Sequence, residues 1–287
     1  MRTGIVKMGM IALFVCMAVA GFRPGTASAE IKLGLLPRLS ATEMTTMFTP
    51  LAEYLSKETG EKVSLVIPRD FDAFKALVAS GQVDMGFANP LVYVQLKKSD
   101  PSLDLLGLAS EKAGIKFRGI IIARKDTGIE KVQDLKGKKI IFVEQDSAAG
   151  HIFQMLTLSK AGLDVKKDFT KLPFAKKHTN VALAVFNKAA DAGGIREDDL
   201  EKMKAVVDLA QIKIVAYTDY YPNWPLFGTK RINKATSEKV KAALLKLKPN
   251  SPEAQRVAGS AQITGFAPIV DKDYDLLRQA AKVAGAL

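Results

Sequence analysis

Four small residues, Ser147, Ala148, Ala149 and Gly150, stand between a short apolar run, KKIIFV, and a stretch whose apolar residues recur with a helical period. The first turn of a helix leaves backbone N–H groups without intrahelical partners and carries partial positive charge. Small side chains let an anion reach those donors directly. These residues therefore predict an anion-binding turn. The alternative is that Asp146 or Ser147 is an N-cap and that the small residues only pack tightly.

Other side chains suited to ligand binding follow predicted strands or begin predicted helices. His178 begins the helix in KHTNVAL and, with a reference pKa of about 6.5, would donate to an oxyanion. A solvated loop histidine is the alternative. Open α/β sheets bind ligands at the carboxyl ends of their strands. Candidates at such positions in the first half of the chain are Arg38, Phe71, Asn89 and Tyr93.

These four candidates differ in what they would contribute. Arg38 would pair an anion bidentately, although single surface arginines are common. Phe71 and Tyr93 suit a hydrophobic core as well as a cleft wall. An aromatic group at residues 217–224 stands out in a chain with 7% aromatic residues. It is interpreted either as hinge packing or as a cleft wall that contacts an organic substituent or a cation, with Trp224 as the candidate contact.

Catalytic motifs are missing from the sequence. There is no G-x-S-x-G, no H-E-x-x-H and no P-loop. The chain has two histidines, and its single cysteine, Cys16, lies in the apolar segment near the N-terminus. A Ser-His-Asp triad or a metal-ligand set is therefore hard to assemble. The sequence predicts no enzyme activity, no cofactor and no metal site.

Residues 1–29 have the features of a cleaved secretory signal peptide. Arg2 and Lys7 give a positive start, residues 8–22 are almost all apolar, and Ala27-Ser28-Ala29 is a small-x-small cleavage site. The apolar run is short for a membrane span. The chain that follows contains no cysteine, so its fold depends on its core alone. We therefore expect a periplasmic protein without a membrane span in the mature chain.

The net charge of +12 bears on the class of partner. Basic residues are spread along the chain rather than gathered in blocks, and no RNP-like or helix-turn-helix pattern appears. A nucleic-acid partner is therefore not expected. A positive surface would, however, raise the local concentration of an anionic ligand.

The order of elements predicts an α/β protein with two lobes. Short apolar runs alternate with amphipathic segments in two successive series, the pattern of doubly wound, mainly parallel sheets flanked by helices. Two hinge crossings, near residues 123–125 and 220–225, would join the lobes and leave a cleft for a ligand. We assign the last helices to the first lobe, which has few of its own. The predicted division is residues 30–123 plus 223–287 for lobe 1 and 124–222 for lobe 2.

Over residues 30–231 the sequence resembles the periplasmic phosphate/phosphite/phosphonate-binding family of ABC transporters. The most specific elements are G-x-V-D-x-G-F at residues 81–87 and D-x-x-x-G after the KKI strand. The resemblance implies a two-lobed periplasmic binding protein fold of type II that closes about a hinge. It also implies ligand contacts at the Ser147 turn and at His178, and an aromatic contact at Phe71.

The sequence departs from that family at two places. The family usually has hydroxyl side chains at three consecutive positions of the anion-binding turn, and here Ala148 and Ala149 replace two of them. Trp224 stands where phosphonate-binding members have an acidic residue that meets the amine of the ligand. These departures predict weaker discrimination among oxyanions and no preference for an aminoalkyl phosphonate.

The predicted function is the periplasmic solute-binding component of an ABC importer. The resemblance implies that it closes on a small oxyanion such as phosphate, phosphite or a phosphonate, and that its permease is a separate membrane protein. A monomer is expected, because single-cleft binding proteins usually act alone. Two alternatives remain open: a ligand-binding sensory module that acts with a membrane kinase or chemoreceptor, and an enzyme on the same two-lobed fold.

Overall fold

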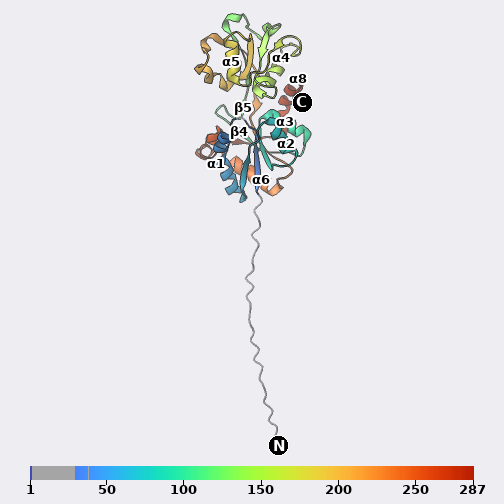
Figure 1. The fold of residues 1–287 in the computed structure, drawn as a ribbon, viewed down its shortest axis with the longest axis vertical. Coiled ribbons are helices and arrows are strands. Elements are labelled where there is room, and N and C mark those ends of the chain that lie inside the picture. Colours follow the sequence, from blue (N-terminus) through green and yellow to red (C-terminus); the bar gives the residue numbers. More distant parts are fainter. Residues whose placement is uncertain (2–29, 38) are drawn as a thin grey trace.

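The computed structural model describes Met1, residues 30–37 and residues 39–287. The predicted signal peptide, beyond its first residue, and Arg38 lie outside the described residues. Figure 1 shows two bodies of strands and helices, one above the other, with the C-terminus at their junction. The two-lobed α/β fold predicted from the order of elements is confirmed.

The first sheet lies in lobe 1 and has mixed pairing. Its strands are β1 (Ile31–Leu35), β2 (Val63–Val66), β3 (Met85–Phe87), β4 (Asp104–Ser110), β12 (Pro225–Gly228) and β13 (Gly265–Ala267). Their order is β13-β4-β12-β3-β1-β2. β1 pairs in parallel with β2 and β3, whereas β12 and β13 run antiparallel to their neighbours. The helices of this lobe are α1 (Ala41–Thr59), α2 (Phe71–Ala79), α3 (Pro90–Ser99), α6 (Lys234–Lys246), α7 (Pro252–Ala258) and α8 (Asp275–Val283).

The second sheet lies in lobe 2 and is also mixed rather than mainly parallel. Its strands are β6 (Gly119–Arg124), β7 (Lys139–Ile141), β8 (Thr170–Lys171), β9 (Ala192–Arg196) and β10 (Ile212–Tyr217). In the order β10-β6-β9-β7-β8, β7 pairs in parallel with β8 and β9, and β6 pairs antiparallel with β9 and β10. The helices are α4 (Phe153–Lys160) and α5 (His178–Phe186).

Short helical turns complete the structure. One is a π-turn, η3 (Ala148–Ile152). The 3₁₀ turns are η1 (Lys125–Thr127), η2 (Val132–Leu135), η4 (Glu197–Asp199), η5 (Glu201–Ala205), η6 (Leu209–Gln211), η7 (Gly259–Ala261) and η8 (Asp271–Tyr274). Residues 197–211 contain the 3₁₀ turns η4, η5 and η6 rather than a continuous α-helix.

The chain enters the second sheet earlier than predicted. A crossing near residues 123–125 would leave the preceding isoleucines in lobe 1, but Ile120, Ile121 and Ile122 are fully buried within β6 and pack into the lobe 2 core. The link between the lobes is instead β5 (Lys116–Phe117), paired antiparallel with β11 (Tyr221–Pro222). β11 lies within the second predicted crossing at 220–225.

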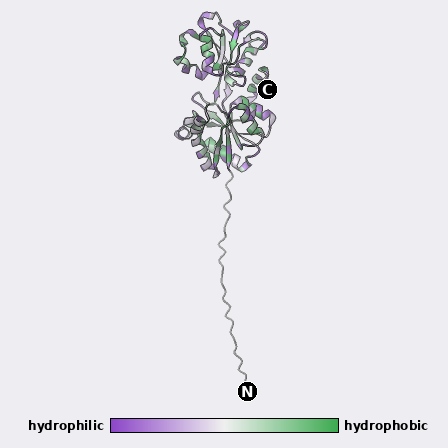
Figure 2. Cartoon of the chain, viewed as in Figure 1, coloured by the Kyte–Doolittle hydropathy of each residue, from purple (hydrophilic) through white to green (hydrophobic). Residues whose placement is uncertain are grey.

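Each sheet has its own apolar core, and a further cluster joins the lobes. Figure 2 shows hydrophobic residues in the strands of both lobes, and both hydrophobic and hydrophilic residues on the surrounding helices. In the joining cluster, Phe153 and Leu156 of α4 pack with Leu277 and Ala280 of α8. Among the described residues, no helix has both the length and the apolar character needed to cross a bilayer.

Candidate functional site

A cavity of about 790 Å³ lies between the lobes. It is lined by strand ends and helix starts from both of them. The lobe 1 side and its hinge contribute Pro37, Arg69, Asp70, Phe71, Asp72, Asn89, Phe117 and Trp224. The lobe 2 side contributes Val143, Glu144, Gln145, Asp146, Ser147, Ala148, Ala149, Phe174, Lys176, His178 and Arg196.

Lobe 1 brings the starts of α2 and α3 to this cavity. The Asp70 carboxylate accepts the Ala73 N–H at 2.7 Å and caps α2, so Phe71 begins the helix at the cavity wall. The Asn89 side chain caps α3 by accepting the Val92 N–H at 2.9 Å. Asn89 therefore lines the cavity as predicted, but its side-chain oxygen is already engaged.

Lobe 2 contributes the Ser147 turn, and its geometry differs from the predicted one. Ser147 is extended, with φ −78° and ψ 112°, and the π-turn follows it directly. The Ser147 carbonyl accepts from the N–H of Ile152 at 3.1 Å. Because this is the first bond of the turn, the N–H groups of residues 148–151 have no partner within the helix. Among the described residues these N–H groups have no backbone partner, so the helix offers donors beside Ser147, Ala148 and Ala149, which all line the cavity.

A buried glutamine supports the π-turn. The Gln154 side chain is fully buried, and its amide nitrogen lies 2.7 Å from the Ala149 carbonyl. The same nitrogen reaches the carbonyls of Ile120 and Ile195 in the sheet at 3.2 and 3.3 Å. Gln154 therefore ties the turn to strands β6 and β9. Sequence reasoning missed it; the available signal is a glutamine on an otherwise apolar stretch of α4.

Two of the predicted site residues do not line the cavity. A Cβ on Gly150 would lie 2.8 Å from Val143 Cβ and 2.7 Å from Ser147 Oγ, so Gly150 is required by packing behind the turn. Tyr93 is fully buried, and its hydroxyl donates to Asp271 at 2.9 Å. The prediction of a ligand contact for Tyr93 is therefore wrong, because its side chain faces the protein interior. The predicted contact of Gly150 is through its backbone N–H, which has no partner within the helix, so this contact stays a prediction.

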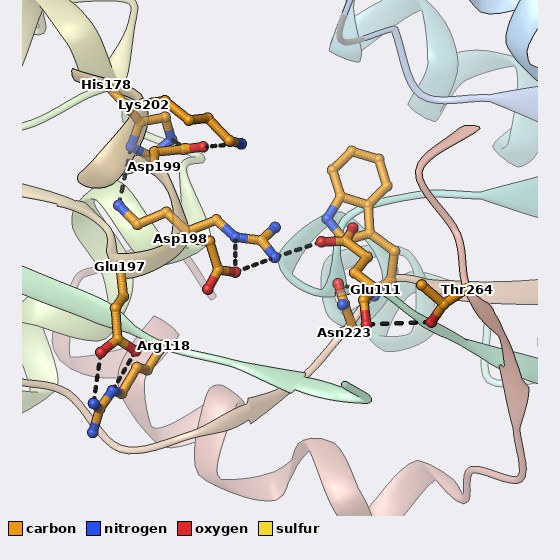
Figure 3. Close-up of polar contacts among 11 residues, drawn as sticks. Glu111, Arg118, His178, Glu197, Asp198, Asp199, Lys202, Asn223 and Thr264 are labelled. Carbon is orange, nitrogen blue, oxygen red and sulfur yellow. Dashed lines mark hydrogen bonds and ion pairs between the residues drawn. The ribbon is translucent and has the colours of Figure 1, made fainter. Parts of the chain in front are cut away.

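His178 lies on the cavity wall in a defined protonation state. Its Nδ1 accepts the backbone N–H of Arg196 at 3.1 Å, which requires the ring to be neutral with its proton on Nε2. Nε2 lies 3.9 Å from the Asp199 carboxylate (Figure 3). Burial lowers the pKa of His178, an effect that exceeds the opposing attraction of Asp199. His178 is thus able to donate one N–H bond to an anion at neutral pH.

His151, the other histidine, lies behind the turn and also stays neutral. Its Nδ1–H donates to the Gln145 carbonyl at 2.9 Å, and its ring packs against Phe142 and Phe174. Its Nε2 is buried and has no hydrogen-bond partner among the described residues. Burial lowers the pKa of His151. Its position matches a role in holding the loop that precedes Ser147.

We expect the stability of the ligand-free protein to decrease as the pH falls below about 6.5. The pKa of both histidines is lowered from 6.5 in the folded state, so the unfolded chain binds more protons just below that pH. Urea unfolding at pH 7.5 and pH 5.5 measures the effect, and His151→Gln should reduce the pH dependence. An equal loss of stability in the variant and the parent would assign the effect to other groups.

Several cavity residues were not predicted from the sequence. Arg196 ends β9, and its guanidinium forms ion pairs with Glu111 at 2.5 Å and Asp198 at 2.8 Å. It also stacks 4.5 Å above the ring of Phe117. The only local signal was a charged residue at the carboxyl end of the strand AGGIR. Also missed among the lining residues were Arg69, Lys176, Phe117 and Phe174.

The aromatic group near the second crossing serves two purposes. Trp224 lines the cavity and packs 5.5 Å from Phe87. Tyr221 is fully buried and stacks on Phe153 at 3.7 Å, so it belongs to the hinge packing. Tyr217 and Tyr220 are exposed. Trp224, Phe71, Phe117 and Phe174 together give the cavity apolar wall beside its hydrogen-bond donors.

Comparison with known proteins identifies similar sequences. A family model described as "ABC transporter, phosphonate, periplasmic substrate-binding protein" matches residues 33–274. The phosphate-import protein PhnD of Mycolicibacterium smegmatis is 24% identical, over 96% of this chain and 94% of its own length. The tetrathionate sensor histidine kinase TtrS of Salmonella typhimurium is also 24% identical, over 84% of this chain but 43% of the kinase.

Solved structures share the fold. PhnD1 from Prochlorococcus marinus, in complex with methylphosphonate, has a TM-score of 0.72 and 16% identity, covering 90% of this chain and 99% of its own. XAC2383 from Xanthomonas citri has a TM-score of 0.76 and 18% identity, covering 89% and 97% of the two chains. At these identities the comparison establishes the fold alone.

Proposed function

Because the chain belongs to the family of periplasmic substrate-binding proteins of phosphonate ABC transporters, we propose that it encloses a small oxyanion between its lobes and delivers it to a separate permease. Phosphate, phosphite and simple phosphonates are the candidate ligands. The observation that carries the proposal is that the Ser147 turn, with N–H groups that have no partner within the helix, and the neutral ring of His178 line the same cavity. In this proposal the protein binds its ligand without chemical change and acts as a monomer. A signal peptide directs its export to the periplasm and is then cleaved.

The hydrogen-bond donors at the cavity are sufficient in number for micromolar binding of an oxyanion. The turn offers backbone N–H groups and the Ser147 hydroxyl, and His178 offers Nε2–H. Hydrogen bonds to a charged group contribute about 1.5–3 kcal/mol each, so about three of them approach the roughly 8 kcal/mol of micromolar binding. Ser147, Ala148, Ala149 and His178 are therefore our proposed oxyanion contacts, with Asn89 and Phe71 opposite them.

We propose that ligand binding closes the lobes about the β5–β11 link. The lobe 1 residues are then 30–117 and 223–287, which revises the predicted division to follow the sheets. Closure is favoured only if the ligand makes contacts in the closed state that the open state lacks. Small-angle X-ray scattering with and without methylphosphonate should record a smaller radius of gyration with ligand. An unchanged radius would contradict a hinged mechanism.

Ligand specificity is the direct test of the proposed function. Trp224, Phe117 and Phe174 offer apolar surface, which favours an organic substituent by about 25 cal/mol per Å² buried. We expect alkyl or aryl phosphonates to bind more tightly than 2-aminoethylphosphonate of similar size. The reason is that position 224 carries a tryptophan instead of the acidic residue that would bind the amine. Competition calorimetry against inorganic phosphate, methylphosphonate, phenylphosphonate and 2-aminoethylphosphonate measures this order. A preference for 2-aminoethylphosphonate would contradict the proposal that the ligand carries an apolar substituent.

A sensory role is the second candidate, favoured by the similarity to part of the tetrathionate sensor kinase. A sensor would need the same two-lobed binding unit but a kinase partner instead of a permease. Tetrathionate belongs in the ligand panel for this reason. Binding of tetrathionate without binding of any phosphonate or phosphate would favour the sensory role. Sustained turnover of phosphate esters, removed by Ser147 and His178 variants, would favour an enzyme.

A further inference from the structure

Arg196 faces the cavity with one nitrogen uncommitted. Its Nε and Nη2 both contact the Asp198 carboxylate, at 3.0 and 2.8 Å, and Nη2 also contacts Glu111 at 2.5 Å. Among the described residues Nη1 has no hydrogen-bond partner. Arg196 lines the cavity, and its side chain is only 15% exposed, so its ion pairs hold this donor in a fixed direction.

The supports of Arg196 hold it in place more firmly than the other cavity cations. Asp198 accepts hydrogen bonds from Nε and Nη2 of the guanidinium. The guanidinium carbon, Cζ, lies 4.5 Å from the centre of the Phe117 ring. Arg69 and Lys176, by comparison, have side chains that are 88% and 70% exposed. An exposed cation gains little from pairing with an anion, whereas an oriented, partly desolvated guanidinium forms stronger bonds.

Arg196 also lies beside the other proposed donors. It ends β9, which pairs with β7, the strand that leads into the Ser147 turn. Its own backbone N–H binds Nδ1 of His178 at 3.1 Å, and this bond leaves the His178 proton on Nε2. Three elements of lobe 2 thus present donors at one edge of the same sheet: the Ser147 turn, the start of α5 and the end of β9.

We infer that Arg196 is a ligand-binding residue and that its Nη1 completes the oxyanion site. We also infer that the negative charge of Glu111, from lobe 1, partly neutralises Arg196 and so weakens anion binding. The inference rests on the proposed function. In the ligand-free protein Glu111 and Asp198 compensate the arginine, and Glu111 opposes the approach of an anion. Removing the Glu111 charge while Asp198 keeps the guanidinium in place should therefore strengthen anion binding.

Two substitutions test the inference because they are expected to act in opposite directions. Arg196→Gln should weaken binding of methylphosphonate and inorganic phosphate at least tenfold in calorimetry, because a charged donor is lost and two carboxylates remain. Glu111→Gln keeps the shape of the side chain and should strengthen binding about threefold or more. Thermal unfolding of the ligand-free variants establishes that both are folded, and Arg196→Gln with Glu111→Gln should bind better than Arg196→Gln alone.

Arg118 provides the matched control. It forms a comparable ion pair with Glu197, with both bonds at 2.6 Å, and stacks on Tyr217, but it does not line the cavity. Arg118→Gln should leave the affinity unchanged. Parental affinity in Arg196→Gln, or weakened binding in Glu111→Gln as well, would overturn the inference and leave the pair as a brace between lobes. Failure of the parent protein to bind either anion would overturn the proposed function itself.

Discussion

Gly150→Ala is expected to destabilise the ligand-free protein by about 1–3 kcal/mol, the usual cost of overpacking a filled site. The new Cβ would lie 2.8 Å from Val143 Cβ and 2.7 Å from Ser147 Oγ. Val143 is buried at the end of the strand segment before the turn, so it has little room to move away. Chemical denaturation in the absence of ligand measures the effect, and Gly150→Val should cost more than Gly150→Ala.

A second substitution separates packing from ligand contact. Val143→Ala keeps Cβ but removes Cγ2, the Val143 atom nearest to a Cβ built on Gly150. The double variant should therefore be less destabilised than the sum of the two single variants. Coupling energies between touching residues are typically about 0.5–3 kcal/mol. Additive losses of stability would contradict the packing role. A large loss of oxyanion affinity in a stable Gly150→Ala protein would place this residue in the binding site.

The Ser147 turn illustrates how far the sequence alone could lead. Small residues at a helix start correctly indicated a turn that faces a cavity, and Ser147, Ala148 and Ala149 line it. The sequence could not divide the small residues into those that face the cavity and Gly150, which packs behind them. That division depends on the π-turn, whose wider winding changes the direction of each side chain from the one an α-helix would give.

Long-range contacts limited the rest of the site prediction. The alternation of apolar runs and helices predicted two lobes because sheet and helix periods are local properties of the chain. Arg196, by contrast, is fixed by Glu111, which is 85 positions away along the chain. A tyrosine at position 93 suits a cleft wall as well as a hydrophobic core. Its hydrogen bond to Asp271, 178 positions away along the chain, places its side chain in the core. Such pairings become visible only in the folded chain.

Ala148→Pro is expected to weaken methylphosphonate binding by about 1.5–3 kcal/mol, which is roughly ten- to a hundredfold. Proline removes the N–H of residue 148, which has no partner within the π-turn, and places a carbon where an anion would lie. The fold should tolerate the change. Residue 148 is the first of the helical turn, a position that accepts proline, and Ser147 already has the extended conformation that a residue before proline prefers.

Ala148→Val is the matched control, because it adds as many carbon atoms as proline does but keeps the N–H. Both variants crowd a side chain that is only 6% exposed, so any effect of bulk on the turn should appear in each. The proline variant should therefore bind methylphosphonate much more weakly than the valine variant in calorimetry, while thermal unfolding without ligand remains similar for the two. Equal affinities would show that the N–H of residue 148 is not a donor to the anion. The cradle would then have to rest on the side chains of Ser147 and His178, and their substitution would become the decisive measurement.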